Sequence, residues 1–269
     1  MAFGMSAVVE DLLLDLDAEY AALTAALTGL PEAVWDVPTP ATGWSVRDQI
    51  THLAYFDHLT MQAILDPATF AEVRDNAMLD LQVFVTAASR AGDGKSGVEM
   101  LDWWEHEHGG LVQALRAADP SIRVPWFGAS MGLASKASAR LMETWAHGQD
   151  VVDALRLQRE PTSRLRHVAR LGFMAFANSF RTRDLPVPEV PVRVDLLAPD
   201  GQTWSWGPID APDQVTGTAL DFCLVVTQRR HRVDTGLTTT GETAAALDDD
   251  RPGFPGPPGK GRSVGQFSD

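Results

Sequence analysis

The chain has 269 residues, of which 45% are hydrophobic and 22% are charged, and its formal net charge is -14. This length suits two modest globular domains or one large domain, and the composition is that of a folded protein. Because nucleic-acid-binding proteins usually carry a basic face, the acidic charge argues against a nucleic-acid partner.

The cysteine content and the N-terminus bear on the compartment. A single cysteine, Cys223, excludes a disulfide or a cysteine zinc cluster within one chain. The N-terminal residues lack the basic segment of a signal peptide, and no run of about 18 apolar residues predicts a membrane span. We therefore expect a cytoplasmic protein without a membrane partner.

The first part of the chain shows helical periodicity. Apolar residues at helical spacing predict an amphipathic helix over residues 6–29, and a turn-rich stretch follows it. Ser45 and Asp48 then resemble a capping box at the start of a helix. This pattern predicts a helix over 46–65.

Further helical patterns follow with short breaks between them. Pro67 stands at an N1-like position and predicts a helix that runs to about residue 90. Two more helices are expected over 97–118 and 130–156. Together these helices predict a four-helix bundle over residues 1–157.

The pattern changes near residue 158, where strand signals join the helical ones. Alternating apolar residues on either side of a Pro-Asp-Gly turn predict a β-hairpin. Residues 158–250 are therefore expected to form a small α+β domain, followed by a Pro/Gly-rich tail with little to bury. The expected elements are a helix over 165–184, the hairpin over 190–208, a helix over 215–232, a strand within 236–244 and the tail over 251–269.

The helix over 130–156 carries three polar residues on one face. Glu143, His147 and Asp150 are spaced by four and three residues and interrupt a stripe of small side chains. Spacing alone favours a plain interpretation, in which Glu143 and His147 form an i,i+4 pair worth a few tenths of a kcal/mol. The alternative is half of a metal site.

His52 would complete that site from the helix over 46–65, where it shares a face with Phe56. His52, Glu143 and His147 offer two imidazoles and one carboxylate and leave a fourth coordination position open, as catalytic zinc sites do. Asp150 is placed to accept the second N–H of a ligand histidine. In the plain interpretation His52 is a core histidine.

Two segments carry a resemblance to a known family. GWSVRDQITHLAYFD (43–57) and LMETWAHGQDVVDAL (141–155) resemble the signatures of the mycothiol-dependent maleylpyruvate isomerases, which belong to the DinB-like metal-binding four-helix bundles. The resemblance implies zinc on His52, Glu143 and His147 and an α+β C-terminal domain. The chain looks similar to an actinobacterial subfamily marked by VPWFG (124–128), RLMETWAHGQD (140–150) and TALDFCLVVTQRRHR (218–232).

The resemblance also implies mycothiol as a co-substrate. Zinc lowers the pKa of a bound thiol, and the thiolate can add to an electrophilic small molecule, for S-transfer or for cis-trans isomerisation. Because Cys223 stands among apolar helix residues, an external thiol suits such a site. The candidates for binding these molecules are Arg47, Arg229 and Arg230 as catalytic groups, with Trp126 and Arg229 as mycothiol-binding groups.

Several alternatives remain open at this stage. The basic run at 229–232 can simply complement a helix dipole. The same metal could serve a thiol-independent tailoring enzyme, as a Lewis acid for a cyclase or isomerase. Another divalent metal is conceivable, including the iron of an oxygenase, although we favour zinc. A non-catalytic metal- or ligand-binding protein is the third class, and both a monomer and a homodimer are compatible with the sequence.

Overall fold

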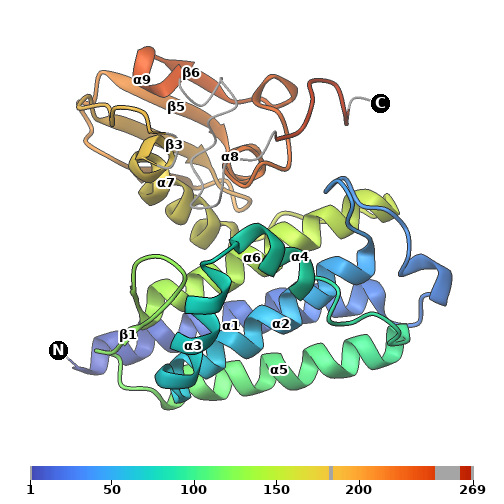
Figure 1. Cartoon of the computed structure of the whole chain (residues 1–269). Helices are drawn as coiled ribbons and strands as arrows, with labels where there is room; N and C mark the ends of the chain where they lie inside the picture. Colours follow the sequence, from blue (N-terminus) through green and yellow to red (C-terminus); the bar gives the residue numbers. More distant parts are fainter. Residues whose placement is uncertain (1, 182–183, 246–260, 268–269) are drawn as a thin grey trace. The chain divides into compact units, whose positions relative to one another are not determined.

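The computed structural model describes residues 2–181, 184–245 and 261–267 (Figure 1). The chain divides into two compact units, Met1–Gln158 and Arg159–Asp269, which we call the helical unit and the C-terminal unit. The C-terminal unit combines helices with a four-stranded sheet. The predicted α+β fold class is therefore confirmed.

Four long helices build the helical unit, and each contacts two others of the four. Helices α1 and α2 each pack against α5 and α6 (Figure 1). The predicted four-helix bundle is thereby confirmed. The four helices are α1 (Ala2–Leu27), α2 (Val46–Leu65), α5 (Gly97–Ala117) and α6 (Leu133–Leu155).

Helix α2 begins at the predicted residue. The Ser45 hydroxyl accepts a hydrogen bond from the Asp48 backbone N–H, and the Asp48 carboxylate accepts one from the Ser45 backbone N–H at 2.7 Å. This capping box satisfies two N–H groups that the first turn leaves free. Because the start is fixed, the angular position of every later side chain on α2 is fixed as well.

The single helix predicted from Pro67 to about residue 90 is wrong. The structure has two helices there, α3 (Pro67–Ala77) and α4 (Leu81–Ala88). The Asp80 side chain accepts a hydrogen bond from the Val83 N–H at 3.0 Å and thereby starts a new helix. No proline or glycine marks this break, so the sequence pattern does not show it.

The helix predicted from residue 130 begins three residues later. Two short strands, β1 (Arg123–Val124) and β2 (Met131–Gly132), pair antiparallel immediately before α6. They close a loop over residues 125–130 that contains Trp126 and Phe127. This small sheet places the VPWFG segment against the bundle.

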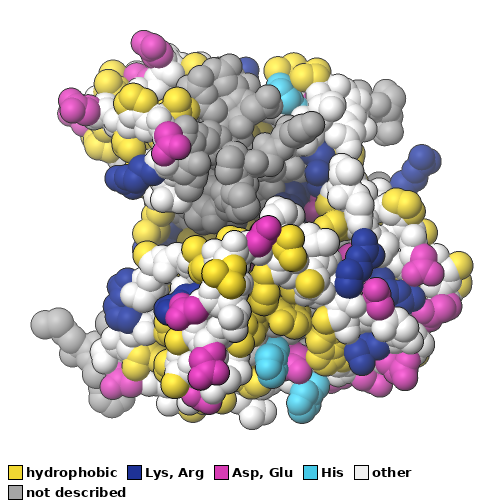
Figure 2. All heavy atoms as spheres, in the orientation of Figure 1, with side chains coloured by type: hydrophobic (Ala, Val, Ile, Leu, Met, Phe, Trp, Pro, Cys, Tyr) yellow, Lys and Arg dark blue, Asp and Glu magenta, His cyan; other side chains and the backbone are white. Residues whose placement is uncertain are grey.

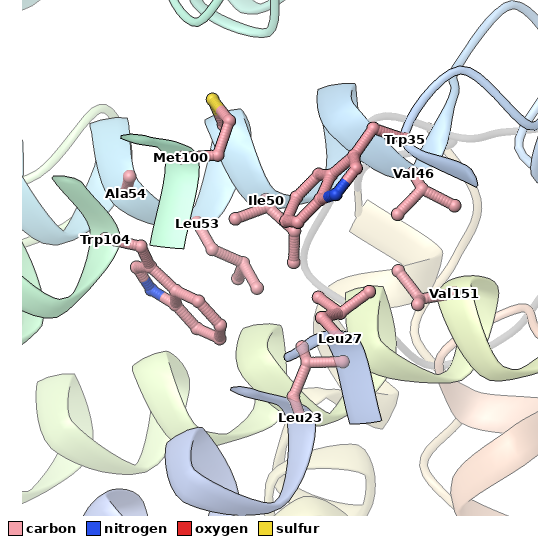
Figure 3. Close-up of a cluster of buried hydrophobic side chains, with 10 residues drawn as sticks. All are labelled: Leu23, Leu27, Trp35, Val46, Ile50, Leu53, Ala54, Met100, Trp104 and Val151. Atoms are coloured by element: carbon pink, nitrogen blue, oxygen red, sulfur yellow. The ribbon is translucent and has the colours of Figure 1, made fainter. Parts of the chain in front are cut away.

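One part of the bundle core gathers side chains from α1, α2, α5 and α6 and from the segment before α2 (Figure 3). Trp35 is 2% exposed, and its indole lies so close to Gly97 that a Cβ at that position would be 2.0 Å from Nε1. Each large apolar side chain buried here stabilises the fold by roughly 1.5–3 kcal/mol. The cluster comprises Leu23, Leu27, Trp35, Val46, Ile50, Leu53, Ala54, Met100, Trp104 and Val151.

A charged network also crosses the bundle interior. The Asp57 carboxylate is 1% exposed and accepts hydrogen bonds from Arg140 Nε at 2.8 Å and Trp104 Nε1 at 3.0 Å. His108 lies between Asp57 and a second carboxylate, Asp17. Its Nε2 is 2.9 Å from an oxygen of Asp17. His108 Nδ1 lies 3.8 Å from Asp57, so that carboxylate acts on the imidazole through its charge. The network ties all four helices together.

We expect this network to make the stability depend on pH. Burial opposes the charge of His108, but the Asp17 hydrogen bond and the Asp57 charge outweigh it and raise the pKa of His108 to about 9. A raised folded-state pKa stabilises the protein below about pH 6.5, and this contribution is lost as the pH rises towards 9. The expected loss is roughly 3 kcal/mol, because one pKa unit corresponds to about 1.4 kcal/mol.

Urea unfolding at pH 6.5 and at pH 9 measures this loss. The variant His108→Gln should have a clearly smaller difference between the two pH values, because it has no group that titrates in this window. An equal pH dependence of the variant and the parent would show that His108 does not cause it.

The C-terminal unit contains the predicted hairpin. Strands β3 (Val192–Leu197) and β4 (Thr203–Trp206) pair antiparallel, and the sheet order is β4-β3-β5-β6. Strand β3 runs parallel to β5, and β5 runs antiparallel to β6. The remaining elements of this unit are α7 (Leu165–Arg181), β5 (Asp213–Thr218), α8 (Ala219–Val226), η2 (Arg232–Asp234), β6 (Thr238–Thr240) and α9 (Glu242–Ala245).

The helix predicted over 215–232 is wrong in its first and last parts. Residues 213–218 form β5 instead, and α8 begins only after Thr218, whose side chain accepts a hydrogen bond from the Asp221 N–H at 3.0 Å. Gly217 has a φ of 149°, a backbone angle that residues with a side chain rarely adopt. The glycine and the threonine cap together allow the change from strand to helix.

Much of the predicted tail lies outside the described residues, which resume only at 261–267. None of the described helices combines the length and the apolar character needed to cross a membrane. On the face shown in Figure 2, acidic side chains are scattered over the helical unit and do not gather in one patch.

Candidate metal centre

Helices α2 and α6 bring three predicted ligands together. Contacts between the two helices pair early residues of α2 with late residues of α6, so the helices run antiparallel. His52 faces Glu143 across this interface, and His147 lies one turn further along α6. The sequence placed His52 on one helix and Glu143 and His147 on another, and the packing of these helices brings the three side chains into one cluster.

The atoms of the cluster lie at distances that suit a small cation. Nε2 of His52 is 3.5 Å from Oε2 of Glu143, and Nε2 of His147 is 3.1 Å from the same oxygen. Ligand atoms bound 2.0–2.1 Å from a tetrahedral zinc ion are about 3.3 Å apart. One donor atom from each residue lies within 4.8 Å of the other two. The three side chains could therefore hold a zinc ion with little rearrangement.

A hydrogen-bond chain determines which nitrogen of His147 carries its proton. The Thr39 hydroxyl donates to the Trp44 carbonyl at 2.8 Å, so its oxygen accepts from Gln49 Nε2 at 2.9 Å. The Gln49 carbonyl then faces Nδ1 of His147 at 2.5 Å and makes this nitrogen the donor.

The consequence concerns the other nitrogen of His147. In the neutral ring, Nε2 presents a lone pair to the Glu143 carboxylate, so two hydrogen-bond acceptors face each other. Such an arrangement is stable only with a cation between them, either a proton or a metal ion. The protein's own hydrogen bonds thus prepare the ligand nitrogen for a cation.

We expected Asp150 to accept the second N–H of a ligand histidine. At His147 this expectation is corrected, because Gln49 accepts that hydrogen bond. Nδ1 of the other histidine, His52, is buried and has no hydrogen-bond partner among the residues that the structure describes. Asp150 itself is 1% exposed. Sequence reasoning missed Gln49, although its position one turn before His52 places it on the same face of α2.

Burial and charge fix the protonation of two cluster members. Burial, helped by the charge of His147, lowers the pKa of His52 to about 4, so this ring is neutral at pH 7. Burial raises the pKa of Glu143, but the neighbouring imidazoles of His147 and His52 outweigh it and hold this pKa well below its usual range. A neutral imidazole and an ionised carboxylate are the forms that bind metals.

The cluster is accessible on the side of Glu143, whose side chain is 28% exposed, against 11% for His52. Among the described residues, the group of potential ligands at this position consists of three members. His58, the other histidine that could have closed the site, instead has its Nδ1 2.9 Å from Glu107. Three ligands and an open side are typical of a catalytic metal site.

Aromatic rings surround the cluster. Trp44 lies 5.3 Å from His52 and 5.8 Å from His147 between ring centroids, and Phe56 lies 4.4 Å from His52. Trp126 lies 6.2 Å from Phe56, so it is one ring removed from the cluster. Its predicted role in binding mycothiol stays a prediction.

Arg47 has structural partners. Its guanidinium forms ion pairs with Glu32 at 2.7 Å and Asp36 at 3.3 Å, and it also donates to the Lys95 carbonyl. These contacts fasten the segment before α2 to the start of α5. These contacts do not involve the cluster, and the predicted catalytic role of Arg47 stays a prediction.

Arg229 and Arg230 belong to the C-terminal unit, just after α8. Arg229 donates to the Thr227 carbonyl at 2.6 Å, and the guanidinium of Arg230 lies 3.7 Å above the ring of Phe267. Their predicted roles with mycothiol and in catalysis remain predictions. Cys223 is buried in α8, and burial raises the pKa of its thiol well above the usual value.

The fold and the cluster define the class first: a helical bundle joined to an α+β unit, with a two-histidine, one-carboxylate group between two antiparallel helices. Residues 16–152 match the family described as the mycothiol maleylpyruvate isomerase N-terminal domain. The chain belongs to this family. Residues 188–236 match a second family, described as wyosine base formation.

Whole-chain comparisons agree with this assignment. Uncharacterised proteins from two strains of Mycobacterium tuberculosis, CDC 1551 / Oshkosh and H37Rv, are each 43% identical over 248 residues, which is 92% of this chain and 96% of theirs. Two crystal structures of mycothiol-dependent maleylpyruvate isomerase, one of them a histidine-to-alanine mutant, share the fold. Their TM-scores are 0.55 and 0.56 at 16% and 15% identity, over 86% of this chain and 92% of those chains.

Proposed function

We propose that this protein is a zinc-dependent enzyme that uses mycothiol to transfer sulfur to an electrophilic small molecule or to isomerise its double bond. The observation that carries the proposal is the facing pair of acceptors, Nε2 of His147 and Oε2 of Glu143, with His52 beside them. The family supports the same conclusion, since it is named for mycothiol and for an isomerase.

The residues of the cluster have distinct tasks in this proposal. His52, Glu143 and His147 would hold the zinc ion, which supplies an open position where a thiol is kept as the thiolate. Gln49 holds the proton on Nδ1 of His147 and so keeps Nε2 directed at the metal position. Trp44 and Phe56 pack on the imidazole rings and keep bulk water from them.

An external thiol fits what the chain contains. The one cysteine, Cys223, lies in the C-terminal unit, is buried and has a raised thiol pKa, so it is a poor nucleophile. In the isomerisation, the external thiolate forms a C–S bond at one carbon of a conjugated double bond, and the electron pair moves onto the substrate. After rotation the C–S bond breaks, the double bond forms again and the thiolate leaves unchanged.

Calorimetric titration of the zinc-loaded protein with mycothiol tests the proposal. We expect about one equivalent to bind and about one proton to be released per site at pH 7, because a thiol becomes a thiolate there. The analogue of mycothiol with oxygen in place of sulfur is the matched control. It should bind at least ten times more weakly and release no proton.

Equal binding of mycothiol and its oxygen analogue would contradict a metal-bound thiolate. A protein that holds zinc but does not bind mycothiol would instead favour the thiol-independent tailoring enzyme.

A further inference from the structure

The C-terminal unit contains a cavity that the proposed function does not use. It lies between α7, α8, β3 and β5 (Figure 1), and its volume is about 300 Å³. The segment 187–191 forms a further wall. Protein interiors are packed so closely that voids larger than a water molecule are few. A space of this size instead reaches the lower end of the range of ligand-binding pockets, which is about 300–1,000 Å³.

The lining of this cavity is apolar throughout. Among the described residues that line it, no side chain carries a charge, a hydroxyl or an amide. The inner wall consists of buried side chains, Val194 and Val215 of the sheet and Phe222 of α8. Met174 and Val190 also line the cavity and are exposed, so they mark its mouth. An apolar ligand can therefore reach the core of this unit from solvent.

A glycine sets the distance between the two helices that flank the cavity. Gly172 of α7 lies so close to α8 that a Cβ at this position would be 2.6 Å from Cγ2 of Val226. The glycine therefore allows the two helices to touch at this point. Helix α7 continues from there along the cavity, which Phe173, Phe176 and Ala177 line.

Prolines stiffen the wall opposite α7. Pro188 and Pro191 line the cavity, and Pro208 lines it from the connection after β4. The ring of a proline fixes its φ angle, so a segment rich in proline has few backbone conformations. Such a wall resists collapse into the space beside it. The cavity is therefore largely preformed, which lowers the cost of binding a ligand.

Phenylalanines determine which apolar molecule fits best. Phe173, Phe176 and Phe222 line the cavity from two helices. The ring of Phe176 is held in place by an edge-to-face contact with buried Phe180, at 5.2 Å between centroids. Aromatic pairs attract each other beyond the burial of their area. Because an apolar cavity of about 150 Å³ holds benzene, twice that volume suits two rings.

We propose that this cavity is a binding site for a small, neutral aromatic molecule of about two rings. A charged ligand does not fit, because the apolar lining cannot replace the water that a buried charge loses. Mycothiol does not fit either, since the hydroxyl groups of its sugar and inositol would lack partners. A protein partner needs roughly 800 Å² of surface on each side, whereas this cavity has space for only a few side chains.

The site is separate from the metal centre, because its lining residues all belong to the C-terminal unit. The inference therefore does not depend on the zinc–thiol proposal. It also assigns no reaction to the cavity, since the described lining contains neither an acid nor a base. The role of the site is binding.

Titration of the full-length protein with 1-naphthylamine tests this proposal. This probe is neutral at pH 7, and its emission moves to shorter wavelength in apolar surroundings. Ala177→Phe places a ring in the cavity and should lower the affinity for the probe at least tenfold. Ala177→Glu places a carboxylate there and should have an effect of the same size. Because Ala177 is only partly buried, both variants leave the inner wall intact.

The matched controls are the same two replacements at Ala175. This residue is also partly buried on α7, but two positions along a helix correspond to about 200° around its axis. Ala175→Phe and Ala175→Glu should bind the probe like the parent. Circular dichroism checks the fold of each variant, and Met174→Glu, at the mouth, replaces an Ala177 variant that fails to fold.

Matched ligands test the chemical class. Naphthalene should displace the probe. 1-Naphthoate has the same two rings with a carboxylate and should displace the probe at least ten times more weakly. Zinc-loaded and chelator-treated protein should bind the probe equally, and mycothiol should not displace it.

Several results would overturn the inference. Displacement by mycothiol, or loss of binding with the metal, would place the probe at the metal centre. Unchanged binding by the Ala177 variants, or equal losses in the Ala175 variants, would show that the cavity is not the site. The same holds if the parent does not bind the probe at submillimolar concentration. The zinc–thiol proposal stands or falls separately, by its own titration with mycothiol.

Discussion

Replacing His147 by alanine is expected to abolish the retention of zinc. The parent protein, purified and dialysed, should contain close to one zinc per chain by elemental analysis, and His147→Ala should contain almost none. The reason is that His147 provides the nitrogen that Gln49 orients towards the Glu143 carboxylate, and loss of it leaves two ligands. Two-ligand sites are too weak to survive dialysis.

The control for this prediction is His58→Ala. His58 lies on α2 like His52, but its side chain is 46% exposed and pairs with Glu107. This variant should keep its zinc. A parent protein without zinc or any other metal would mean that a proton occupies the space between His147 and Glu143, and the proposed chemistry would then fail.

Replacing Asp57 by asparagine is expected to destabilise the fold by about 3–5 kcal/mol. The change is nearly isosteric but leaves the charge of Arg140 unpaired in the bundle core, where Arg140 is 3% exposed. Removing one partner of a buried ion pair has a cost of this size because the remaining charge has lost both water and counter-ion. Urea unfolding followed by circular dichroism at pH 7 measures the free energy of unfolding.

A surface ion pair gives the matched control. Asp75 is paired with Arg74 at 2.7 Å, but its side chain is 69% exposed. Asp75→Asn should change the free energy of unfolding by less than about 1 kcal/mol, because water screens exposed pairs. Similar losses in the two variants would show that the Asp57–Arg140 pair is not desolvated as the structure indicates.

The sequence by itself determined the features that depend on local spacing. The capping box at Ser45 and Asp48 lies within four consecutive residues, and it correctly predicted where α2 begins. Helical periodicity likewise placed Glu143 and His147 on one face of α6. These features could be predicted because neighbours three and four residues apart meet whatever the rest of the chain does.

Local competition explains the elements that were predicted wrongly. The apolar residues of 215–226 suit both a strand and a helix, and the pairing of β5 with β3 and β6 decided in favour of a strand up to Thr218. The side chain of Asp80 similarly divided one expected helix into α3 and α4. Strand pairing joins residues far apart in the sequence, so periodicity within one segment does not reveal it.

Only the tertiary structure decided how the site is assembled. The antiparallel packing of α2 on α6 set His52 opposite Glu143 and gave Nδ1 of His147 to Gln49 rather than to Asp150. It also placed Lys136 in the core, with its amine over the ring of Trp126. Each of these contacts joins residues that are at least ten positions apart. The physical reason is that burial and long-range partners arise from packing between helices, which the pattern of a single helix does not contain.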